Sequence, residues 1–340
     1  MSRLQTLLST LSARPLQCDG ATGTQLQSLG LQAGECCERW VLDHPDRVRL
    51  VHQRYLDAGA DLLTTNTFGG AAFSLAAHGL DARAAEINRA AALLAREVAG
   101  ERAWVLGDIG PFGGILEPYG ETEPATATAA FRAQAAALLE GGADAILVET
   151  MSDPVESALA IAAARKAGAQ FVLATFAFQN TPSGFRTMMG ATPAAAVQAA
   201  LDAGANVVGA NCGTQLTLDD YASLTAELLA AANAKPVGAS LATPSGAPAA
   251  SPAKQGVASD APTNAITTNV TAANAAPVIV QPNAGSPVQD LITGAIRYNV
   301  TPEAFATAAA RYITLGARIV GGCCGTTPAH IAASARMNKK

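Results

Sequence analysis

The stretch RIVGGCCGTTP, from Arg318 to Pro328, joins a short β-branched run to a glycine-rich turn that carries two adjacent cysteines. Neighbouring side chains of a strand point to opposite faces, so Cys323 and Cys324 can reach one metal ion only where the backbone turns sharply between them. The surrounding glycines allow such a turn because they lack a Cβ atom. The stretch is therefore interpreted as a strand that ends in a turn with metal-binding chemistry.

The same order of strand, polar turn and helix recurs along the chain. Short apolar runs alternate with alanine-rich helical patterns such as Arg83–Val98 and Ala125–Leu139. The predicted strands are Pro15–Cys18, Asp61–Thr65, Trp104–Ile109, Ala145–Val148, Phe171–Phe176, Val207–Ala210, Val278–Gln281 and Arg318–Gly321. Repeated strand–helix alternation implies a parallel sheet, and eight such units predict an α/β protein with a closed (β/α)8 TIM barrel.

Polar or glycine-rich motifs follow seven of these eight strands. They are DGATGT at 19–24, TNTFGG at 65–70, DIGP at 108–111, ET at 149–150, NCG at 211–213, PNAG at 282–285 and GGCCGTTP at 321–328. In a barrel all seven lie on the C-terminal rim, where active sites are built. A doubly wound sheet would use only a few strand ends at a switch point, so the pattern favours the barrel.

One segment interrupts the even spacing of the strands. Between the sixth and seventh, Gly238–Pro277 consists of Ala, Ser, Thr, Pro and Asn with almost no charge and few large apolar residues. Such a composition is poorly suited to burying a core. We expect residues 1–340 to form a single barrel domain with 238–277 as a low-complexity insertion, either peripheral or covering the site.

Composition excludes several classes of protein. The chain has 340 residues, 49% of them apolar, and a formal net charge of −5, which is unlike a nucleic-acid-binding surface. No run approaches the roughly 20 apolar residues of a membrane span, and the N-terminus has no signal-peptide cleavage site. Six cysteines in a chain of this size are not a disulfide scaffold. A cytoplasmic protein is expected.

Cys212, which also follows a predicted strand, joins Cys323 and Cys324 as a candidate metal ligand. Three thiolates on Zn2+ leave its fourth position open, and such a site can bind an incoming thiol and lower its pKa from about 8.5. Thiolate alkylation is the reaction this suggests. The alternatives are buried structural cysteines, a strained vicinal disulfide, or a phosphate-binding helix start at Thr327. Cys36 and Cys37 are possible further ligands whose role the sequence does not define.

Other motif residues are suited to binding an amino acid. The turn at Asp19–Thr24 offers backbone N–H groups for a carboxylate. Glu149 needs a cation if it is buried, either a substrate ammonium or an arginine. Asn66 and Asn283 could orient the substrate or the metal, or be structural. His330 is predicted to be an ordinary helix residue, and Asp108 to close its own turn.

At these residues the sequence resembles the homocysteine S-methyltransferase family, most closely the homocysteine-binding barrel of cobalamin-dependent methionine synthase. The similarity runs in order from about Leu16 to Ile331. It includes the stretches DGATGTQLQ at 19–27, AGADLLTTNTFGG at 58–70, GDIGP at 107–111, GGADAILVETMSD at 141–153, GANCG at 209–213, QPNAG at 281–285 and VGGCCGTTPAHI at 320–331.

The resemblance implies zinc on Cys212, Cys323 and Cys324, with the sulfur of homocysteine as a further ligand and methionine as the product. No protein nucleophile is needed. The amino-acid end of the substrate would be held by Glu149 and by the loop residues Asp19, Gly20, Ala21 and Thr22. Asn283 would lie near the metal and occupy its open position when substrate is absent.

The methyl donor is the least defined part of the expected reaction. TNTFGG, GDIGP and PNAG look most like the cobalamin-dependent branch, so methylcobalamin, free or on a separate corrinoid protein, is expected. S-methylmethionine, S-adenosylmethionine or betaine is the alternative, because Trp40, Phe68, Phe112 and Tyr119 near the rim leave an aromatic cage open. An alternative of another class is a non-catalytic zinc or thiol module that docks a corrinoid protein.

Overall fold

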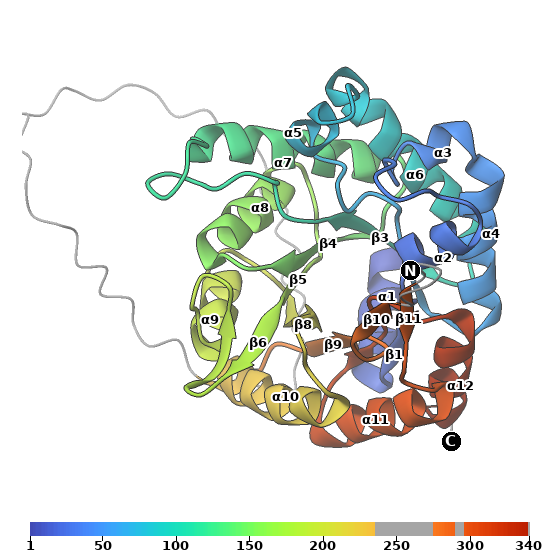
Figure 1. Cartoon of the computed structure of the whole chain (residues 1–340), viewed down its shortest axis with the longest axis vertical. Coiled ribbons are helices and arrows are strands. Elements are labelled where there is room, and N and C mark those ends of the chain that lie inside the picture. The colour runs from blue at the N-terminus through green and yellow to red at the C-terminus, as the bar shows by residue number, and fades with distance from the viewer. Residues whose placement is uncertain (235–274, 290–295, 339–340) are drawn as a thin grey trace, which may run out of the picture.

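A computed structural model describes residues 1–234, 275–289 and 296–338. Its centre is a parallel sheet of eight strands in the order β1-β12-β9-β8-β5-β4-β3-β2 (Figure 1). The strands are β1 Leu16–Gln17, β2 Leu62–Thr64, β3 Trp104–Ile109, β4 Ala145–Met151, β5 Val172–Phe176, β8 Val207–Cys212, β9 Val278–Pro282 and β12 Ile319–Val320. Each overlaps one predicted strand, so the strand assignment is confirmed.

The sheet closes on itself. The two strands at the ends of the order, β1 and β2, are joined by a parallel bridge between Cys18 and Leu62. On the other side β1 pairs with β12, with Leu16 opposite Ile319. The predicted (β/α)8 barrel is therefore the observed fold.

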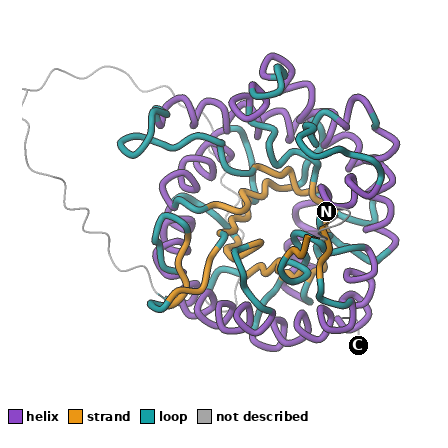
Figure 2. Tube along the Cα trace, in the orientation of Figure 1, coloured by secondary structure: helices purple, strands orange, loops and turns teal. Residues whose placement is uncertain are grey.

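Helices surround the barrel on its outside (Figure 2). The larger ones that follow the strands are α4 Pro45–Asp57, α6 Ala84–Ala99, α7 Pro124–Glu140, α8 Pro154–Lys166, α9 Pro193–Asp202, α10 Leu218–Asn233, α11 Pro302–Leu315 and α12 Pro328–Asn338. Shorter elements in the loops are α2 Thr22–Ser28, α3 Trp40–Asp43, α5 Ala72–Ala76 and the 3-10 turn η1 Asp81–Arg83. None of the described helices is long and apolar enough to cross a membrane.

The N-terminal helix, α1 Arg3–Ala13, packs against apolar residues of the strands at one end of the barrel. Its buried Leu7 and Leu11 contact apolar side chains from the strands, among them Leu106, Leu173 and Ile279. Leu7 and Leu11 are four residues apart, so they lie on one apolar face of the helix. Because this helix fills one end of the barrel, the opening for a ligand lies at the other end.

A recurring turn aligns the strands at their N-terminal ends. After α7 the chain passes through Gly142, whose φ of +96° suits glycine, and then reaches Asp144. The Asp144 carboxylate accepts a hydrogen bond from Val105 N at 2.8 Å, and its own N–H donates to Val105 O at 2.8 Å. The same exchange occurs between Asp61 and Gln17 and between Asn206 and Val172. These contacts fix the register that brings the opposite strand ends together.

Two short hairpins interrupt the barrel pattern and were not predicted. One is formed by β6 Phe178–Thr181 and β7 Gly184–Thr187, after β5. The other is formed by β10 Pro287–Gln289 and β11 Ile296–Tyr298, after β9. Most of the predicted insertion at 238–277 lies outside the described residues, and its role and the single-domain boundary 1–340 stay predictions.

Helix α4 buries an imidazole without a hydrogen-bond partner. His52 is fully buried, and neither of its ring nitrogens has a partner among the described residues. Burial lowers the pKa of His52 from 6.5 to about 4, because the charged form loses its hydration. The imidazole is therefore neutral in the folded protein near neutral pH.

On acidification, His52 takes up a proton in the unfolded chain before it does so in the folded protein. The free energy of unfolding should therefore fall as pH drops. The loss begins as pH drops below 6.5 and ends near pH 4, since the folded pKa is the lower one. Between about pH 7 and about pH 5, His52 should lower the unfolding free energy of the wild type by about 2 kcal/mol. We expect the unfolding free energy of His52→Leu to lack this decrease. Urea titrations at both pH values measure this. His78→Gln, at an exposed histidine, is the control and should leave the decrease unchanged.

Candidate metal centre

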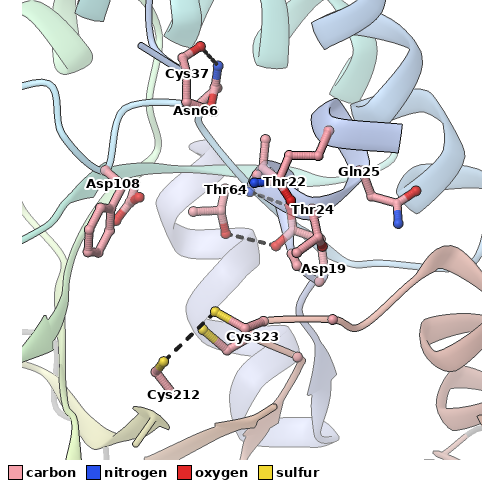
Figure 3. A pocket seen from close by; sticks show the side chains of 18 of the residues that line it. Asp19, Thr22, Thr24, Gln25, Cys37, Thr64, Asn66, Asp108, Cys212 and Cys323 are labelled. Carbon is pink, nitrogen blue, oxygen red and sulfur yellow. Dashed lines mark hydrogen bonds between the residues drawn. The ribbon is translucent and has the colours of Figure 1, made fainter. Parts of the chain in front are cut away.

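The three predicted cysteine ligands come together at the C-terminal rim of the barrel. Cys212 ends β8, and Cys323 and Cys324 follow β12. Their Sγ atoms all lie within 4.8 Å of one another, and Cys212 Sγ is 3.9 Å from Cys324 Sγ. Figure 3 shows Cys212 facing Cys323 across the site. A set of three converging sulfurs is a donor set well suited to zinc.

Local backbone geometry aims these sulfurs inward. Cys212 has a φ of +54° and is followed by Gly213 at +84°, so the chain turns sharply as β8 ends. The hydroxyl of Tyr221 donates to the Cys212 carbonyl and holds this turn. After β12, Cys323 N donates to Pro282 O of β9 at 2.9 Å. The chain turns at Cys324 and Gly325, where Thr326 N donates to Cys323 O at 3.1 Å, and both sulfurs reach the same cluster.

The three thiols hydrogen bond to one another. Hydrogen bonds from Cys323 and Cys324 lower the pKa of Cys212, so its sulfur is the first of the three to ionise. The same contacts raise the pKa of Cys323, and burial raises it further. One thiolate thus accepts from two thiols, and a divalent cation is suited to replace those two protons.

Asn283 lies beside the cluster, as predicted for the loop after β9. Its Nδ2 donates to Gly213 O at 3.3 Å, and its side chain hydrogen bonds to Cys212. Its Oδ1 is buried and has no hydrogen-bond partner among the described residues. A buried amide oxygen left unpaired is costly unless it meets a ligand, so Asn283 Oδ1 is available to a ligand beside the cysteines.

Tyr298 of β11 covers the loop that carries Cys324. Gly325 has a φ of +78°, and a Cβ atom there would lie 2.0 Å from the Tyr298 ring. The Tyr298 hydroxyl hydrogen bonds to the Cys324 thiol, and burial together with the charge of the three nearby cysteines raises the pKa of the phenol to about 12. Glycine at 325 therefore serves both the left-handed turn and the close approach of the ring.

A cavity of about 1130 Å3 opens beside the sulfur cluster. Its wall includes α2, the segment 31–38, the ends of several strands, and Tyr298. The acidic residues that line it are Asp19, Glu38, Asp108 and Glu149, and no Lys, Arg or His is among its described lining residues. This charge argues against the phosphate-binding alternative, because a phosphate would have no cationic partner in the wall.

The DGATGT loop forms part of this wall, with its side chains and backbone in different roles. The Asp19 carboxylate accepts from Thr64 N at 2.7 Å and from Thr64 Oγ1 at 2.8 Å, so it anchors the loop to β2 (Figure 3). Ala21 N donates to Thr326 Oγ1 at 3.0 Å. The N–H groups of Gly20 and Thr22 donate to no protein atom among the described residues. They can donate to a ligand carboxylate.

Glu149 is joined to the sulfur cluster through Asn211. Asn211 Nδ2 donates to Glu149 Oε2 at 3.2 Å and lies 3.9 Å from Cys323 Sγ. Asn211 Oδ1 is held by Thr150 N at 3.0 Å and Thr175 Oγ1 at 2.8 Å. No arginine pairs with Glu149 in the described part of the chain, so its structural alternative, a salt bridge, finds no support.

Asp108 faces Glu149 rather than closing its own turn, so that prediction is wrong. No backbone N–H of the described chain donates to its carboxylate. Burial raises the pKa of Asp108 well above its usual range, and the neighbouring Glu149 raises it further. Burial also raises the pKa of Glu149 to about 7. A proton shared by the two carboxyl groups is therefore the expected state of the ligand-free protein.

The comparisons with known proteins agree with this geometry. A model of the family described as homocysteine S-methyltransferase matches residues 16–337. The chain belongs to the homocysteine S-methyltransferase family. It is 31% identical over 351 residues to methionine synthase of Mycobacterium leprae and 32% identical over 340 residues to that of Mycobacterium tuberculosis. The matches cover 98% and 96% of this chain but 25% of each relative, so it spans about a quarter of their length.

A solved structure of similar fold is that of a homocysteine methyltransferase. The metallated form of MmuM from Escherichia coli superposes with a TM-score of 0.69 at 22% identity, covering 98% of this chain and 99% of that one. At this level of identity the likeness supports the barrel architecture alone.

Other candidate residues lie around the cavity in structural roles. Asn66 donates to Cys37 O at 2.8 Å and accepts from Cys37 Sγ at 3.0 Å, which ties β2 to the segment before α3. Cys36 Sγ donates to Glu38 Oε2 at 3.4 Å. Neither Cys36 nor Cys37 belongs to the sulfur cluster. The six cysteines are free, so the vicinal disulfide is absent from the described chain.

His330 is a helix residue, as predicted. It lies in α12, where Thr327 N donates to its Nδ1 at 3.1 Å, and its Nε2 is 2.9 Å from Val300 O. The carbonyl requires a proton on Nε2, so both ring nitrogens are occupied by structural contacts.

The sequence did not predict the contacts of three residues near the site. Asn211 belongs to the NCG motif. The motif predicts its position after a strand but not its hydrogen bond to Glu149. Asp108 takes a partner other than the predicted one. Tyr298 carries no local signal, because its contact with Gly325 depends on a hairpin that was not predicted.

Gly325→Ala should displace Tyr298 and the Cys324 loop, so zinc content after metal loading should fall well below one per chain. Gly190→Ala is the matched control, because Gly190 has a φ of +82° but a Cβ atom there would meet nothing within 4 Å. Both variants should lose about 1 kcal/mol of unfolding free energy from the backbone. Equal zinc content in the two would contradict the assigned role of the Tyr298 contact.

Proposed function

We propose that this chain transfers a methyl group to the thiol of homocysteine and so produces methionine. The observation that carries the proposal is the convergence of three cysteine sulfurs at the edge of a large acidic cavity. Family membership supports the same reaction class. Because the chain spans a quarter of its curated relatives, its activity and partners are inferred from the site itself.

Cys212, Cys323 and Cys324 would hold zinc, and Asn283 would supply an oxygen when substrate is absent. Zinc bound there would lower the pKa of the substrate thiol, so that a thiolate is present at neutral pH. Three thiolates leave the site poorly suited to activating water, which favours alkylation over hydrolysis. No basic side chain lines the described cavity wall, and none is required.

The remaining residues bind and orient the amino-acid end of the substrate. The free N–H groups of Gly20 and Thr22 would receive its carboxylate, and Glu149 its ammonium group. Asp19 acts indirectly, since its carboxylate is already bonded to Thr64 and holds the loop in place. Asn66 acts on the shape of the cavity wall through Cys37. The sulfur lone pair then forms the new bond to the methyl carbon, and the old methyl bond breaks with its electron pair leaving on the donor.

A methyl-corrinoid is the proposed donor, free or carried by a separate protein. The motifs TNTFGG, GDIGP and PNAG, which look most like the cobalamin-dependent branch, support this choice. The cavity, at about 1130 Å3, is larger than the roughly 300–1,000 Å3 of ordinary small-molecule sites and leaves room beyond the amino acid. The acidic wall favours a second candidate, an onium donor such as S-methylmethionine, S-adenosylmethionine or betaine, because a cation would be attracted to it.

Cys323→Ser should abolish zinc retention and reduce homocysteine methylation by more than about 100-fold, because a metal ligand is lost. Metal analysis after gel filtration and a methionine assay measure the two effects. Cys36→Ser removes a buried thiol outside the cluster and should keep both zinc and turnover. Full activity of a zinc-free Cys323→Ser variant would refute the proposed function.

The donor is identified by comparing methylcobalamin, S-methylmethionine, S-adenosylmethionine and betaine with the zinc-loaded protein and homocysteine. We expect methionine with methylcobalamin. Turnover with an onium compound alone would replace the proposed donor while leaving the thiol chemistry intact. If zinc and homocysteine bind but no donor reacts, the chain is the non-catalytic module instead.

A further inference from the structure

Four thiolates would meet on the metal in the proposed reaction, and only one of them belongs to the substrate. A methyl donor that reaches the site can transfer its group to any of the four, because each thiolate is a nucleophile. A methylated cysteine is a thioether, which is only a weak acceptor, so transfer to the protein would damage the site. The reaction therefore requires cysteine sulfurs that react more slowly than the sulfur of homocysteine.

Two of the protein sulfurs have hydrogen-bond donors from the loops around them. Cys212 Sγ accepts from the side chain of Asn283 and from the backbone N–H of Gly213. Cys323 Sγ accepts from Asn211 Nδ2 at 3.9 Å. Each of these sulfurs therefore shares its lone pairs with an N–H group of the protein.

Cys324 has its donor from a hairpin strand. The hydroxyl of Tyr298, at the end of β11, hydrogen bonds to the Cys324 thiol. The Tyr298 ring packs so closely on Gly325 that a Cβ atom there would lie 2.0 Å from it. Cys324 O accepts from Ala284 N at 2.9 Å, so the backbone of the cysteine is held by the loop after β9. Tyr298 and Cys324 both line the cavity, so their contact lies in the wall that an incoming methyl donor faces.

A hydrogen-bond donor at a thiolate lowers the reactivity of the sulfur. A sulfur bound to a metal carries no proton, so in this pair the Tyr298 hydroxyl donates and the Cys324 sulfur accepts. A charge-assisted hydrogen bond makes a thiolate a weaker base by roughly 10- to 100-fold. Nucleophilicity falls with about the square root of basicity, so alkylation of Cys324 should be slowed by about 3- to 10-fold.

We propose that Tyr298 is a selectivity residue, whose hydroxyl suppresses methylation of Cys324 and so directs the methyl group to the substrate thiolate. The amide donors of the other two cysteines act in the same way. A substrate thiolate that joins the cluster retains more of its nucleophilicity, because these donors already bond to the cysteines. This inference rests on the proposed function, because it takes Cys324 to be a metal ligand. It gives Tyr298 a chemical role beyond packing against the cysteine loop.

The test alkylates the zinc-loaded protein with methyl iodide in the absence of homocysteine. The sulfur lone pair forms the S–CH3 bond, and the C–I bond breaks as iodide leaves with its electron pair. Peptide mass spectrometry gives the initial rate at which each cysteine is methylated. In Tyr298→Phe, which keeps the ring and removes the hydroxyl, methylation of Cys324 should be about 3- to 10-fold faster than in the wild type. The rates at Cys212 and Cys323 should stay unchanged.

Tyr312→Phe is the matched control for the loss of a tyrosine hydroxyl. Tyr312 is buried, and its hydroxyl donates to Leu218 O at 2.8 Å rather than to a sulfur. This variant should show the wild-type rate at all three cysteines. An equal rate at Cys324 in Tyr298→Phe and the wild type would overturn the assignment. So would loss of zinc from Tyr298→Phe or a rise shared equally by the three cysteines, because either would show that Tyr298 only holds the cluster together.

Zinc content and turnover separate this inference from the proposed function. If the wild-type protein does not retain zinc, the proposed function fails and the inference fails with it. If zinc is retained but homocysteine is not methylated, the proposed function fails, while the alkylation rates still decide the role of the hydroxyl. If homocysteine is methylated and Tyr298→Phe alkylates Cys324 no faster than the wild type does, only the assignment of Tyr298 fails.

Discussion

The geometry of the cysteine cluster depends on β9, which lies between β8 and β12 in the sheet. β8 and β12 both pair with β9, and Pro282 at the end of β9 lies in register with Cys212 while its carbonyl accepts from Cys323 N. This single residue therefore sets the separation between the cysteine that ends β8 and the pair that follows β12. At the opposite end of the barrel, Asp144, Asp61 and Asn206 bond β4 to β3, β2 to β1 and β8 to β5, so the position of β8 also depends on its other neighbour. Metal-binding geometry is in this sense a property of the whole barrel.

The charged side chains in the described wall of the cavity are all acidic. Acidic groups and thiols gather at the rim, and cationic side chains are excluded from the described wall. In the proposed function the cysteines would be neutralised by a divalent metal and Glu149 by the ammonium group of the substrate. Asp19, in contrast, is satisfied by Thr64 and serves the shape of its loop. The same residue type thus has a structural or a recognition role according to whether the protein supplies its hydrogen-bond donors.

Much of this architecture could be predicted from the sequence because each unit is local. Continuous apolar runs such as Ala145–Val148 are typical of strands buried on both faces, and the polar motifs marked their ends. The candidate zinc ligands followed from cysteines placed after two of those strands. The hairpins, the contact of Tyr298 with Gly325 and the pairing of Asp108 with Glu149 could not be predicted, because each depends on residues distant in sequence whose approach only the closed barrel defines.

The most direct test of the account counts the sulfur atoms around the metal. Zinc K-edge X-ray absorption of the loaded protein should give three sulfur ligands and a lighter donor, as Cys212, Cys323, Cys324 and Asn283 provide. Adding homocysteine should replace the lighter donor with a fourth sulfur. A spectrum that keeps three sulfurs when homocysteine is bound, or that shows fewer than three without it, would contradict the central claim that the cysteines present zinc to the substrate thiol.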